Sequence, residues 1–356
     1  METVDVAVIG GDGIGPEVTQ EAERLLEVAA AWGGRVRFRF QHFDWGCQYY
    51  LAHGEMMPKD GIQTLSNFPV ILLGAVGFPT VPDHISLWGL LLPIRREFDQ
   101  YVNLRPVRLL RGVEGPLRRF EPGSFNFVVI RENTEGEYSN VGGRLRAGTP
   151  QEVAVSTSLF TRYGTERVIR YAFERAQGAP RRRLTAATKS NGITYTMPFW
   201  DEVFREVGRE YPQVSAELVH IDALAAFFVQ RPDQFDVVVA SNLFGDILTD
   251  LGGAIQGSIG MAASANLNPE RKHPSMFEPV HGSAPDIAGR GVANPIGALW
   301  SAALLLEHVG EREAAARVIP AIESALERGI RTRDLGGTAT TREFADAVLD
   351  AFQAQG

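Results

Sequence analysis

Two aspartates, Asp246 and Asp250, are spaced to share one face of a helix. They follow an apolar run at residues 235–240, and residues 244–251 have the pattern of a helix start. The spacing of four residues puts the two carboxylates about 5–6 Å apart, where like charges repel each other. A hard divalent cation such as Mg²⁺ or Mn²⁺, which prefers oxygen ligands, would offset this repulsion. Alternatively, the carboxylates only favour the positive end of the helix, which suits Asp246 better than Asp250.

Three arginines in the first half of the chain could bind a substrate that carries carboxylates. They are Arg95, Arg105 in the sequence Asn-Leu-Arg-Pro, and Arg131 at the end of an expected strand. A planar guanidinium group holds a carboxylate through two parallel hydrogen bonds. Surface solubility is the competing explanation, and for Arg131 a structural ion pair with Glu132 or Glu135 is the alternative.

A polar loop at residues 278–286 contains three titratable groups and is punctuated by glycine and proline. It precedes the helix expected after Pro295. Loops of this kind on α/β sheets commonly bind ligands, although a purely structural loop explains the same residues. Lys189, after an expected strand, and Tyr138, in an expected loop, would by themselves be surface or packing residues.

Residues 11–16, Gly-Asp-Gly-Ile-Gly-Pro, lie between an expected strand and an expected helix. A dinucleotide fingerprint requires glycine at position 16, where Pro16 stands, so the phosphate-binding mechanism of that motif is not supported. The residues instead predict a tight turn with proline at the first helical position.

The elements that must position these residues alternate between short β-branched runs and helical periodicity. We expect strands at residues 4–9, 70–73, 127–130, 184–188 and 235–240. We expect helices at residues 16–32, 296–308, 312–326 and 341–352. This alternation is typical of a mostly parallel sheet covered by helices, and the sequence therefore predicts an α/β fold. Residues 137–160 instead resemble a hairpin, either an edge of the sheet or an arm that reaches a partner subunit.

Bulk properties narrow the class of protein. With 356 residues the chain is long enough for two domains. A net charge of -8 argues against general affinity for nucleic acid or anionic membranes. The single cysteine, Cys47, excludes an internal disulfide and fits a reducing compartment. Since no signal segment or membrane-spanning run is recognisable, we expect a cytoplasmic location.

Taken together, these segments resemble the β-decarboxylating dehydrogenases, the family of isocitrate and 3-isopropylmalate dehydrogenases. The resemblance extends over essentially the whole chain, and six ordered motifs carry it. The motifs are residues 11–18, 103–106, 131–138, 188–192, 241–250 and 281–294. Residues 81–89, with Trp88, are most similar to the branch of tartrate and D-malate dehydrogenases. Isocitrate dehydrogenases typically have a serine near Gly89, which is absent here.

The resemblance implies a two-domain, three-layer αβα fold that is not a Rossmann fold. Residues 1–100 and 258–356 would form a large discontinuous domain on the NAD side. Residues 101–257 would form a central domain that carries the dimer interface and an arm at about residues 138–160. The active sites of such a homodimer are shared, and the neighbouring subunit contributes Lys189 and Asp222.

The resemblance also implies which residues bind substrate, bind metal and carry out catalysis. Arg95, Arg105 and Arg131 would bind the substrate carboxylates, and Trp88 and Leu91 would limit the group on C3. Asp222 of one subunit and Asp246 and Asp250 of the other would bind Mg²⁺ or Mn²⁺, with K⁺ as a further candidate cation. Lys189 would be the base for the 2-hydroxyl, with a pKa lowered by nearby positive charge. Tyr138 would protonate the enolate left by decarboxylation.

The cofactor implied by the resemblance is NAD. His281, Gly282, Ser283, Ala284, Asp286 and Asn294 would line its site. Asp286 would accept hydrogen bonds from the adenosine ribose and repel a 2′-phosphate, whereas NADP-dependent relatives typically have lysine and tyrosine at positions 286 and 287.

The expected reaction is oxidation of a four-carbon 2-hydroxy diacid followed by β-decarboxylation. A 3-isopropylmalate dehydrogenase is the nearest alternative, because it shares nearly all of these positions. A non-catalytic regulatory subunit is disfavoured, since such a subunit should have lost metal or base residues that this chain retains.

Overall fold

The computed structural model describes residues 2–355 and divides the chain into two compact units. The first unit comprises residues 1–100, 105–125 and 252–356, and the second comprises residues 101–104 and 126–251. Residues 105–125 and 252–257, which the sequence assigned to a central domain, therefore group with the first unit. The chain passes between the units within strand β4 (Val102–Arg108) and within helix α9 (Asn242–Ile255).

The first unit is built on five strands that lie in the order β2-β1-β3-β12-β11. They are β1 (Glu2–Gly11), β2 (Val36–His42), β3 (Val70–Ala75), β11 (Ala263–Leu267) and β12 (Ser275–Pro279). Adjacent strands are parallel except β11 and β12, which are antiparallel. The strands expected at residues 4–9 and 70–73 are confirmed.

Both faces of these strands are buried. On one face, Ala7, Ile9 and Ile71 pack in a core cluster with side chains from residues 45–98. The alternate residues Val6 and Leu72 point to the other face and are also fully buried. Strands covered on both faces have continuous apolar sequences. The expected α/β fold, a sheet covered by helices, is confirmed.

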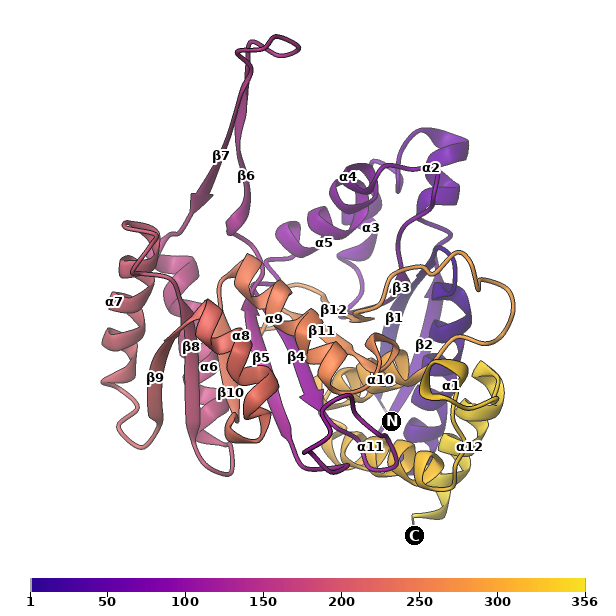
Figure 1. The fold of residues 1–356 in the computed structure, drawn as a ribbon. Coiled ribbons are helices and arrows are strands. Elements are labelled where there is room, and N and C mark those ends of the chain that lie inside the picture. Colours follow the sequence, from indigo (N-terminus) through magenta and orange to yellow (C-terminus); the bar gives the residue numbers. More distant parts are fainter. Residues whose placement is uncertain (1, 356) are drawn as a thin grey trace. The chain divides into compact units, whose positions relative to one another are not determined.

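Helices make up the outer layers of the first unit. Figure 1 shows the C-terminal helices in yellow, close to the N-terminal strands in indigo, and α1 contacts α10, α11 and α12. The three C-terminal helices were expected from periodicity and are confirmed. The helices of this unit are α1 (Gly15–Gly33), α2 (Cys47–His53), α3 (Gly61–Leu65), α4 (Asp83–Ser86), α5 (Leu92–Glu97), α10 (Ile296–His308), α11 (Arg312–Glu327) and α12 (Thr341–Ala354), with short 3-10 turns at Ile259–Met261 and Arg333–Leu335.

The second unit contains four parallel strands in the order β5-β10-β8-β9. They are β5 (Asn126–Glu132), β8 (Arg183–Thr188), β9 (Ser215–His220) and β10 (Val237–Ala240). Helices α6 (Arg162–Gln177), α7 (Thr196–Gly208) and α8 (Ile221–Gln230) pack on them, with a 3-10 turn at Pro232–Gln234. Because every neighbouring pair is parallel, all four carboxyl ends lie at one edge of the sheet.

A hairpin leaves the second unit as a separate two-stranded antiparallel sheet. Its strands are β6 (Gly136–Leu145) and β7 (Val153–Leu159), and Figure 1 shows them projecting away from the strands of that unit. The hairpin expected at residues 137–160 is thus confirmed, and it is not an edge of the large sheet. Its apolar side chains Val141, Leu145, Val153 and Val155 are exposed.

The turn at residues 11–16 is a structural turn. Gly11 and Gly13 have φ angles of +71° and +60°, a region that glycine adopts without strain. The N–H of Asp12 donates to the Ala75 carbonyl at 2.7 Å, and the N–H of Ile14 donates to the Ser283 carbonyl at 2.8 Å. A side chain at Gly13 would collide with that carbonyl. The predicted turn, with Pro16 in the first turn of α1, is therefore confirmed.

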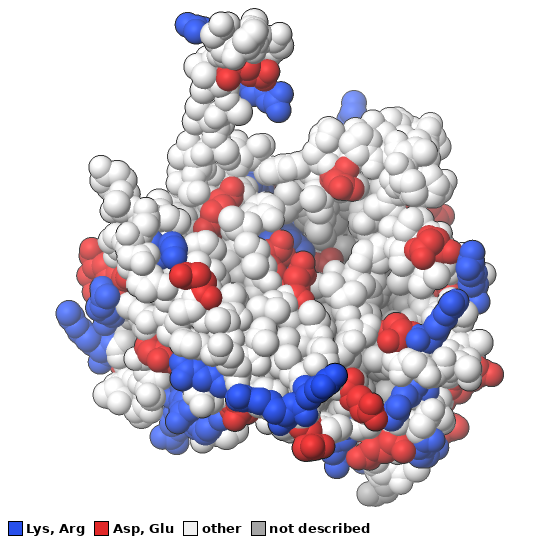
Figure 2. Space-filling view, in the orientation of Figure 1, with Lys and Arg blue, Asp and Glu red and all other residues white. Residues whose placement is uncertain are grey.

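Figure 2 shows lysine and arginine interspersed with aspartate and glutamate on the face that it displays. The hairpin carries both signs, and Arg144 pairs with Glu152 at 3.1 Å. No helix within residues 2–355 is both long enough and apolar enough to cross a bilayer.

Candidate active site

The carboxyl edge of the second unit gathers several of the residues singled out in the sequence. Arg131 lies at the carboxyl end of β5, Lys189 directly follows β8, and Asp222 lies just beyond β9. Asp246 lies in α9, which begins two residues after β10. Ligand sites of open α/β sheets occur at this edge, because the loops that follow parallel strands meet there.

Arg131, Asp246 and Tyr138 form one cluster at this edge. The Nη1 atom of Arg131 donates to Oδ1 of Asp246 in a short ion pair. The Tyr138 hydroxyl, on β6 at the base of the hairpin, donates to Oδ2 of Asp246 at 3.3 Å. The Arg131 guanidinium also lies 5.5 Å from the centre of the Tyr138 ring. Since the Asp246 side chain is 34% exposed, its carboxylate is restrained but still open to an ion from solvent.

Two residues that the sequence did not single out hold this cluster in place. Oδ1 of Asn242 accepts from Nε and Nη2 of Arg131 at 3.1 and 2.7 Å, and its amide donates to the Glu135 carbonyl. The Glu137 carboxylate accepts from the Ser241 hydroxyl and from the N–H of Leu243, at the start of α9. The sequence signal that could have identified Asn242 is an asparagine just after a buried strand, at the start of a helix. Nothing in the sequence pattern marked Glu137.

Lys189 and Asp222 form a second cluster. Nζ of Lys189 lies 2.6 Å from Oδ1 of Asp222, whose side chain is 68% exposed. The hydrogen bond from Lys189 lowers the pKa of the Asp222 carboxyl below its ordinary value. Strand order explains the division into two clusters, because β8 and β9 are neighbours at one side of the sheet while β5 and β10 are neighbours at the other.

The three aspartates predicted to bind a metal are not collected within one chain. Asp246 and Asp250 lie one turn apart on α9 as expected, and Asp250 is exposed. Across residues 2–355, no three histidine, cysteine or acidic side chains converge as a metal site would require. Two carboxylates on α9 and an exposed third at Asp222 are oxygen donors suited to Mg²⁺ or Mn²⁺. The donor set fits such an ion if a second chain supplies Asp222.

The first unit contains the other predicted substrate arginines. Arg95 on α5 is 5% exposed, and its Nη2 donates to Oε1 of Glu278 at 2.7 Å. Arg105 on β4 is 6% exposed. Arginine is almost never this buried unless it is paired. The burial of both side chains therefore argues against the alternative that they only keep the surface soluble.

Trp88 and Leu91 lie in a single turn of π-helix (Leu87–Leu91) between α4 and α5. Such turns are rare and occur frequently at functional sites. Leu91 packs against the core cluster of this unit. The Trp88 ring is partly exposed, and the Arg96 guanidinium covers it at 4.6 Å. The two residues predicted to limit substrate size therefore lie in the same turn, but only Leu91 packs against the core cluster.

The loop after β12 contains the residues predicted to bind NAD. His281 is 8% exposed; its Nδ1 contacts the Gly282 carbonyl at 2.9 Å, while its buried Nε2 has no hydrogen-bond partner within residues 2–355. Burial lowers the pKa of His281, so the ring is neutral near pH 7. Asp286 is exposed. Because the Gly282 carbonyl accepts from Nδ1, the Nε2 atom of the neutral ring is an acceptor, which suits the amine of an adenine base.

The remaining cofactor residues have structural partners. Ser283 and Ala284 belong to the turn that contacts Ile14 through the Ser283 carbonyl, and Ala284 has a φ of +40°. The Asn294 amide donates to Asp334 at 2.9 Å, and its Oδ1 accepts from the N–H of Ile296 at the start of α10. Gly282 has open space around its α-carbon.

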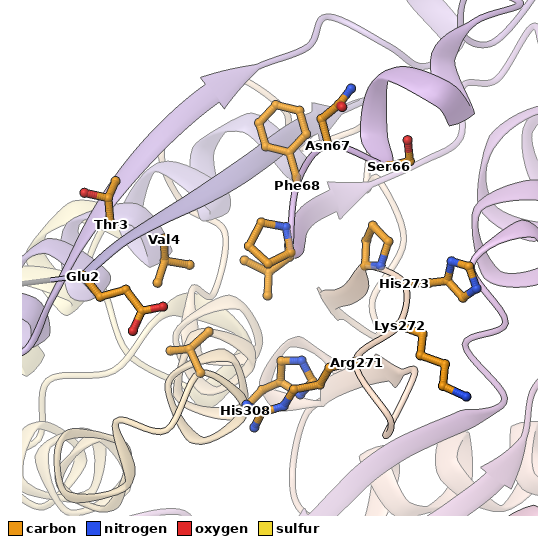
Figure 3. Close-up of a pocket in the computed structure, with 14 residues that line it drawn as sticks. Glu2, Thr3, Val4, Ser66, Asn67, Phe68, Arg271, Lys272, His273 and His308 are labelled. Atoms are coloured by element: carbon orange, nitrogen blue, oxygen red, sulfur yellow. The ribbon is translucent and has the colours of Figure 1, made fainter.

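A cavity of about 360 Å³ lies elsewhere in the first unit. Figure 3 shows its lining, which includes Glu2, Phe68, Arg271 and His308 and none of the predicted site residues. It opens at the amino ends of β1 and β3, whereas the loops that follow the strands lie at their carboxyl ends. We therefore do not assign it to the active site.

Comparison with known proteins identifies the family. The model of the isocitrate/isopropylmalate dehydrogenase family matches residues 5–348. A probable tartrate dehydrogenase/decarboxylase of Bacillus subtilis (strain 168) is 56% identical, with 99% of each chain covered. The D-malate dehydrogenase [decarboxylating] of Escherichia coli (strain K12) is 54% identical, with 98% of each chain covered.

Solved structures agree with this assignment. The crystal structure of isocitrate dehydrogenase from Methylococcus capsulatus matches with a TM-score of 0.88 at 32% identity, covering 98% of this chain and 99% of that one. A β-decarboxylating dehydrogenase from Thermococcus kodakarensis, solved in its apo form, matches with a TM-score of 0.80 at 35% identity, covering 98% of this chain and 96% of that one. The chain belongs to the isocitrate/isopropylmalate dehydrogenase family, and it is a dehydrogenase.

Proposed function

We propose that the enzyme oxidises a four-carbon 2-hydroxy diacid, D-malate or tartrate, with NAD and Mg²⁺ or Mn²⁺, and that the keto acid loses carbon dioxide. The names of relatives at 50–56% identity support this substrate class. The observation that carries the proposal is the Asp246 carboxylate, partly exposed and held between Arg131 and Tyr138. With D-malate the products are pyruvate, carbon dioxide and NADH.

Arginine side chains bind the two carboxylates in this proposal. Arg95, Arg105 and Arg131 are each at most 6% exposed, so their guanidinium groups meet a substrate in a setting with little competing water. For Arg131, Nε and Nη2 donate to Asn242 and Nη1 donates to Asp246, so its guanidinium is held in one orientation.

Lys189 and Tyr138 carry out the proton transfers in this proposal. Lys189 takes the proton of the 2-hydroxyl while C2 gives its hydride to NAD. Loss of the carboxylate as carbon dioxide leaves an enolate, and Tyr138 delivers a proton to its C3. The hydroxyl proton released at the first step balances the proton added at the last, so the overall reaction consumes none.

Asp246, Asp250 and Asp222 of a second chain would hold the divalent cation. When bound there, the cation would lower the pKa of the substrate hydroxyl and polarise the carbonyl during decarboxylation. Arg131 and Tyr138 fix both oxygens of Asp246 before a ligand arrives, which keeps the carboxylate oriented. K⁺ is a further candidate cation.

A homodimer with shared sites accounts for the two separate clusters of the second unit. Each chain would offer its Lys189–Asp222 pair to the Asp246 cluster of its partner. The exposed apolar side chains of the hairpin, among them Leu145 at 65% exposure, suit burial against a second chain.

The cofactor would lie along residues 281–294. The neutral, buried His281 and Asn294 would contact the adenine, with Gly282, Ser283 and Ala284 forming the wall of the site. The exposed Asp286 carboxylate would accept hydrogen bonds from the ribose hydroxyls and exclude a 2′-phosphate.

Trp88 and Leu91 would set the limit on substrate size. A bulky indole leaves room at C3 for hydrogen or hydroxyl but not for an isopropyl group. We expect Trp88→Ala to gain at least about tenfold in kcat/KM on 3-isopropylmalate, roughly the value of one or two buried methylene groups. No gain on 3-isopropylmalate or isocitrate would exclude Trp88 from the substrate pocket.

A panel of substrates tests the proposal. Purified enzyme with Mn²⁺, K⁺ and NAD is assayed on D-malate, L-tartrate, meso-tartrate, 3-isopropylmalate and isocitrate, following NADH and carbon dioxide. We expect turnover of D-malate or a tartrate. Turnover of 3-isopropylmalate alone would establish the alternative dehydrogenase, and turnover of none would favour the regulatory subunit.

A further inference from the structure

Glu278 is a buried carboxylate for which the proposed chemistry gives no role. It lies at the end of β12 and is 7% exposed, next to the loop that we assign to NAD. Its Oε1 accepts two hydrogen bonds, one from Nη2 of Arg95 and one from Nδ2 of Asn266, both at 2.7 Å. Asn266 lies on β11 and is fully buried.

The geometry fixes Glu278 more firmly than an ordinary side chain. Its carboxylate is held by Asn266, and its backbone carbonyl accepts from the Ser301 hydroxyl of α10 at 2.8 Å. Strand β11, strand β12 and helix α10 therefore converge on this one residue. Any group bonded to Glu278 takes its position from the core of the first unit.

Arg95 depends on Glu278 because it lies on a short helix. Helix α5 (Leu92–Glu97) has six residues, too few to fix a long side chain through helical packing alone. Nη2 of Arg95 is bonded to Glu278, while its buried Nε has no hydrogen-bond partner within residues 2–355. A buried N–H without a partner is costly, so it indicates a ligand that accepts there. A substrate carboxylate is such an acceptor.

We infer that Glu278, held by Asn266, is a positioning residue that aims the Arg95 guanidinium at the substrate carboxylate. It acts through Arg95 and not by contact with substrate. The inference rests on the proposed function, because it takes the bound group to be a carboxylate of the hydroxy diacid. The pairing also compensates the arginine's charge when no substrate is present, so the buried site is stable empty.

A double-mutant cycle tests the inference on the full-length enzyme with the turned-over diacid, Mn²⁺ and NAD. We expect Glu278→Ala to raise KM for the diacid at least about tenfold while kcat changes less than about threefold. Glu278→Gln keeps the acceptor oxygen for Arg95 and Asn266, and should restore KM to within about threefold of the wild type. In Arg95→Ala, adding Glu278→Ala should raise KM no further, since the two residues act as one unit.

The control is Glu323→Ala. Glu323 is also a buried glutamate of the first unit that binds arginines, accepting from Arg108 and Arg111. It should lower the melting temperature without changing KM for the diacid. Three results would overturn the inference: an unchanged KM in Glu278→Ala, a Glu278→Gln variant as impaired as the alanine, or additive effects with Arg95→Ala. Absence of turnover by the wild type would instead contradict the proposed function.

Discussion

The two units use an arginine and a carboxylate in different ways. In the second unit, Arg131 is bonded to the neutral amide of Asn242 and to Asp246, whose side chain is 34% exposed. In the first unit, Arg95 is bonded to Glu278, and both side chains are nearly inaccessible, at 6% and 9% exposure. Both ion pairs join an arginine to a carboxylate, but only one of the two carboxylates is open to solvent.

Burial decides what each carboxylate can do. Asp246 can exchange part of its pairing with Arg131 for a cation from solvent, so it suits a metal ligand. Glu278 cannot exchange its partners without leaving a buried charge uncompensated, so it acts only on its neighbours. The comparison predicts that substitution of the accessible carboxylate abolishes chemistry, whereas substitution of the buried one weakens substrate binding.

The largest expected effect comes from the accessible carboxylate. We expect Asp246→Asn to lower kcat/KM at least about 1,000-fold, ~4 kcal/mol, because a metal ligand is lost while the shape is kept. Activity is measured by NADH formation, and the assembly by light scattering, which should show an unchanged mass. The control is Asp233→Asn in the 3-10 turn that precedes β10, which should be fully active. Wild-type activity of Asp246→Asn at ordinary metal concentrations would remove Asp246 from the site.

A mixing experiment tests whether the two clusters of the second unit belong to one site. Lys189→Met and Asp246→Asn should each be inactive, but co-expressed together they should recover about a quarter of wild-type activity. Half of randomly formed dimers are hybrids, and each hybrid of a symmetric dimer holds one intact site when the sites are shared. A mixture as inactive as its parents would show that each chain completes its own site.

The fold could be predicted from the sequence because its signals are local. Apolar runs such as residues 70–73 and periodic segments such as residues 296–308 predict elements that the structure confirms. The unit boundaries could not be read in this way. Residues 105–125 group with the first unit through contacts with distant parts of the chain, such as Arg108 and Arg111 with Glu323, and spacing does not encode such contacts.

The residues of the candidate site were identifiable by type, but their partners were not. The sequence suggested Glu132 or Glu135 as a partner of Arg131, whereas the structure pairs Arg131 with Asp246, across the strand pair β5 and β10. Glu132 instead accepts from the Thr134 hydroxyl and from nearby backbone N–H groups, and burial raises its pKa. Partners such as Asn242 and Glu278 come from strand order, which no local pattern reveals.

The loop that we assign to the cofactor, residues 281–294, provides a further test in the first unit. We expect kcat/KM with NAD to exceed that with NADP by at least about 100-fold, ~2.7 kcal/mol, because the Asp286 carboxylate repels a 2′-phosphate. Asp286→Ser should reduce the ratio to about tenfold, mainly by improving KM for NADP. Equal use of both cofactors by the wild type would exclude this role of Asp286.

A smaller effect, on stability, tests the burial of His308, which lies in the first unit away from the candidate active site. Burial and the nearby Arg271, which Figure 3 shows beside it, lower the pKa of His308 to about 4. Its neutral form is favoured in the folded state, so its contribution is complete above the unfolded pKa of about 6.5 and is lost as pH falls towards 4. Over that range the unfolding free energy of His308→Gln should fall by up to about 3 kcal/mol less than that of the wild type. Parallel pH profiles in urea denaturation would contradict the buried, neutral His308.

The most direct measurement is the stoichiometry of the reaction with D-malate, NAD and Mn²⁺, taking NADH from absorbance and carbon dioxide from the same vessel. The proposed function predicts one carbon dioxide per NADH, and loss of both when the cation is removed by a chelator. The two products should return together when Mn²⁺ is restored. NADH formation that persists without a divalent cation, or that proceeds with no carbon dioxide from any four-carbon diacid, would contradict a metal-dependent decarboxylating dehydrogenase.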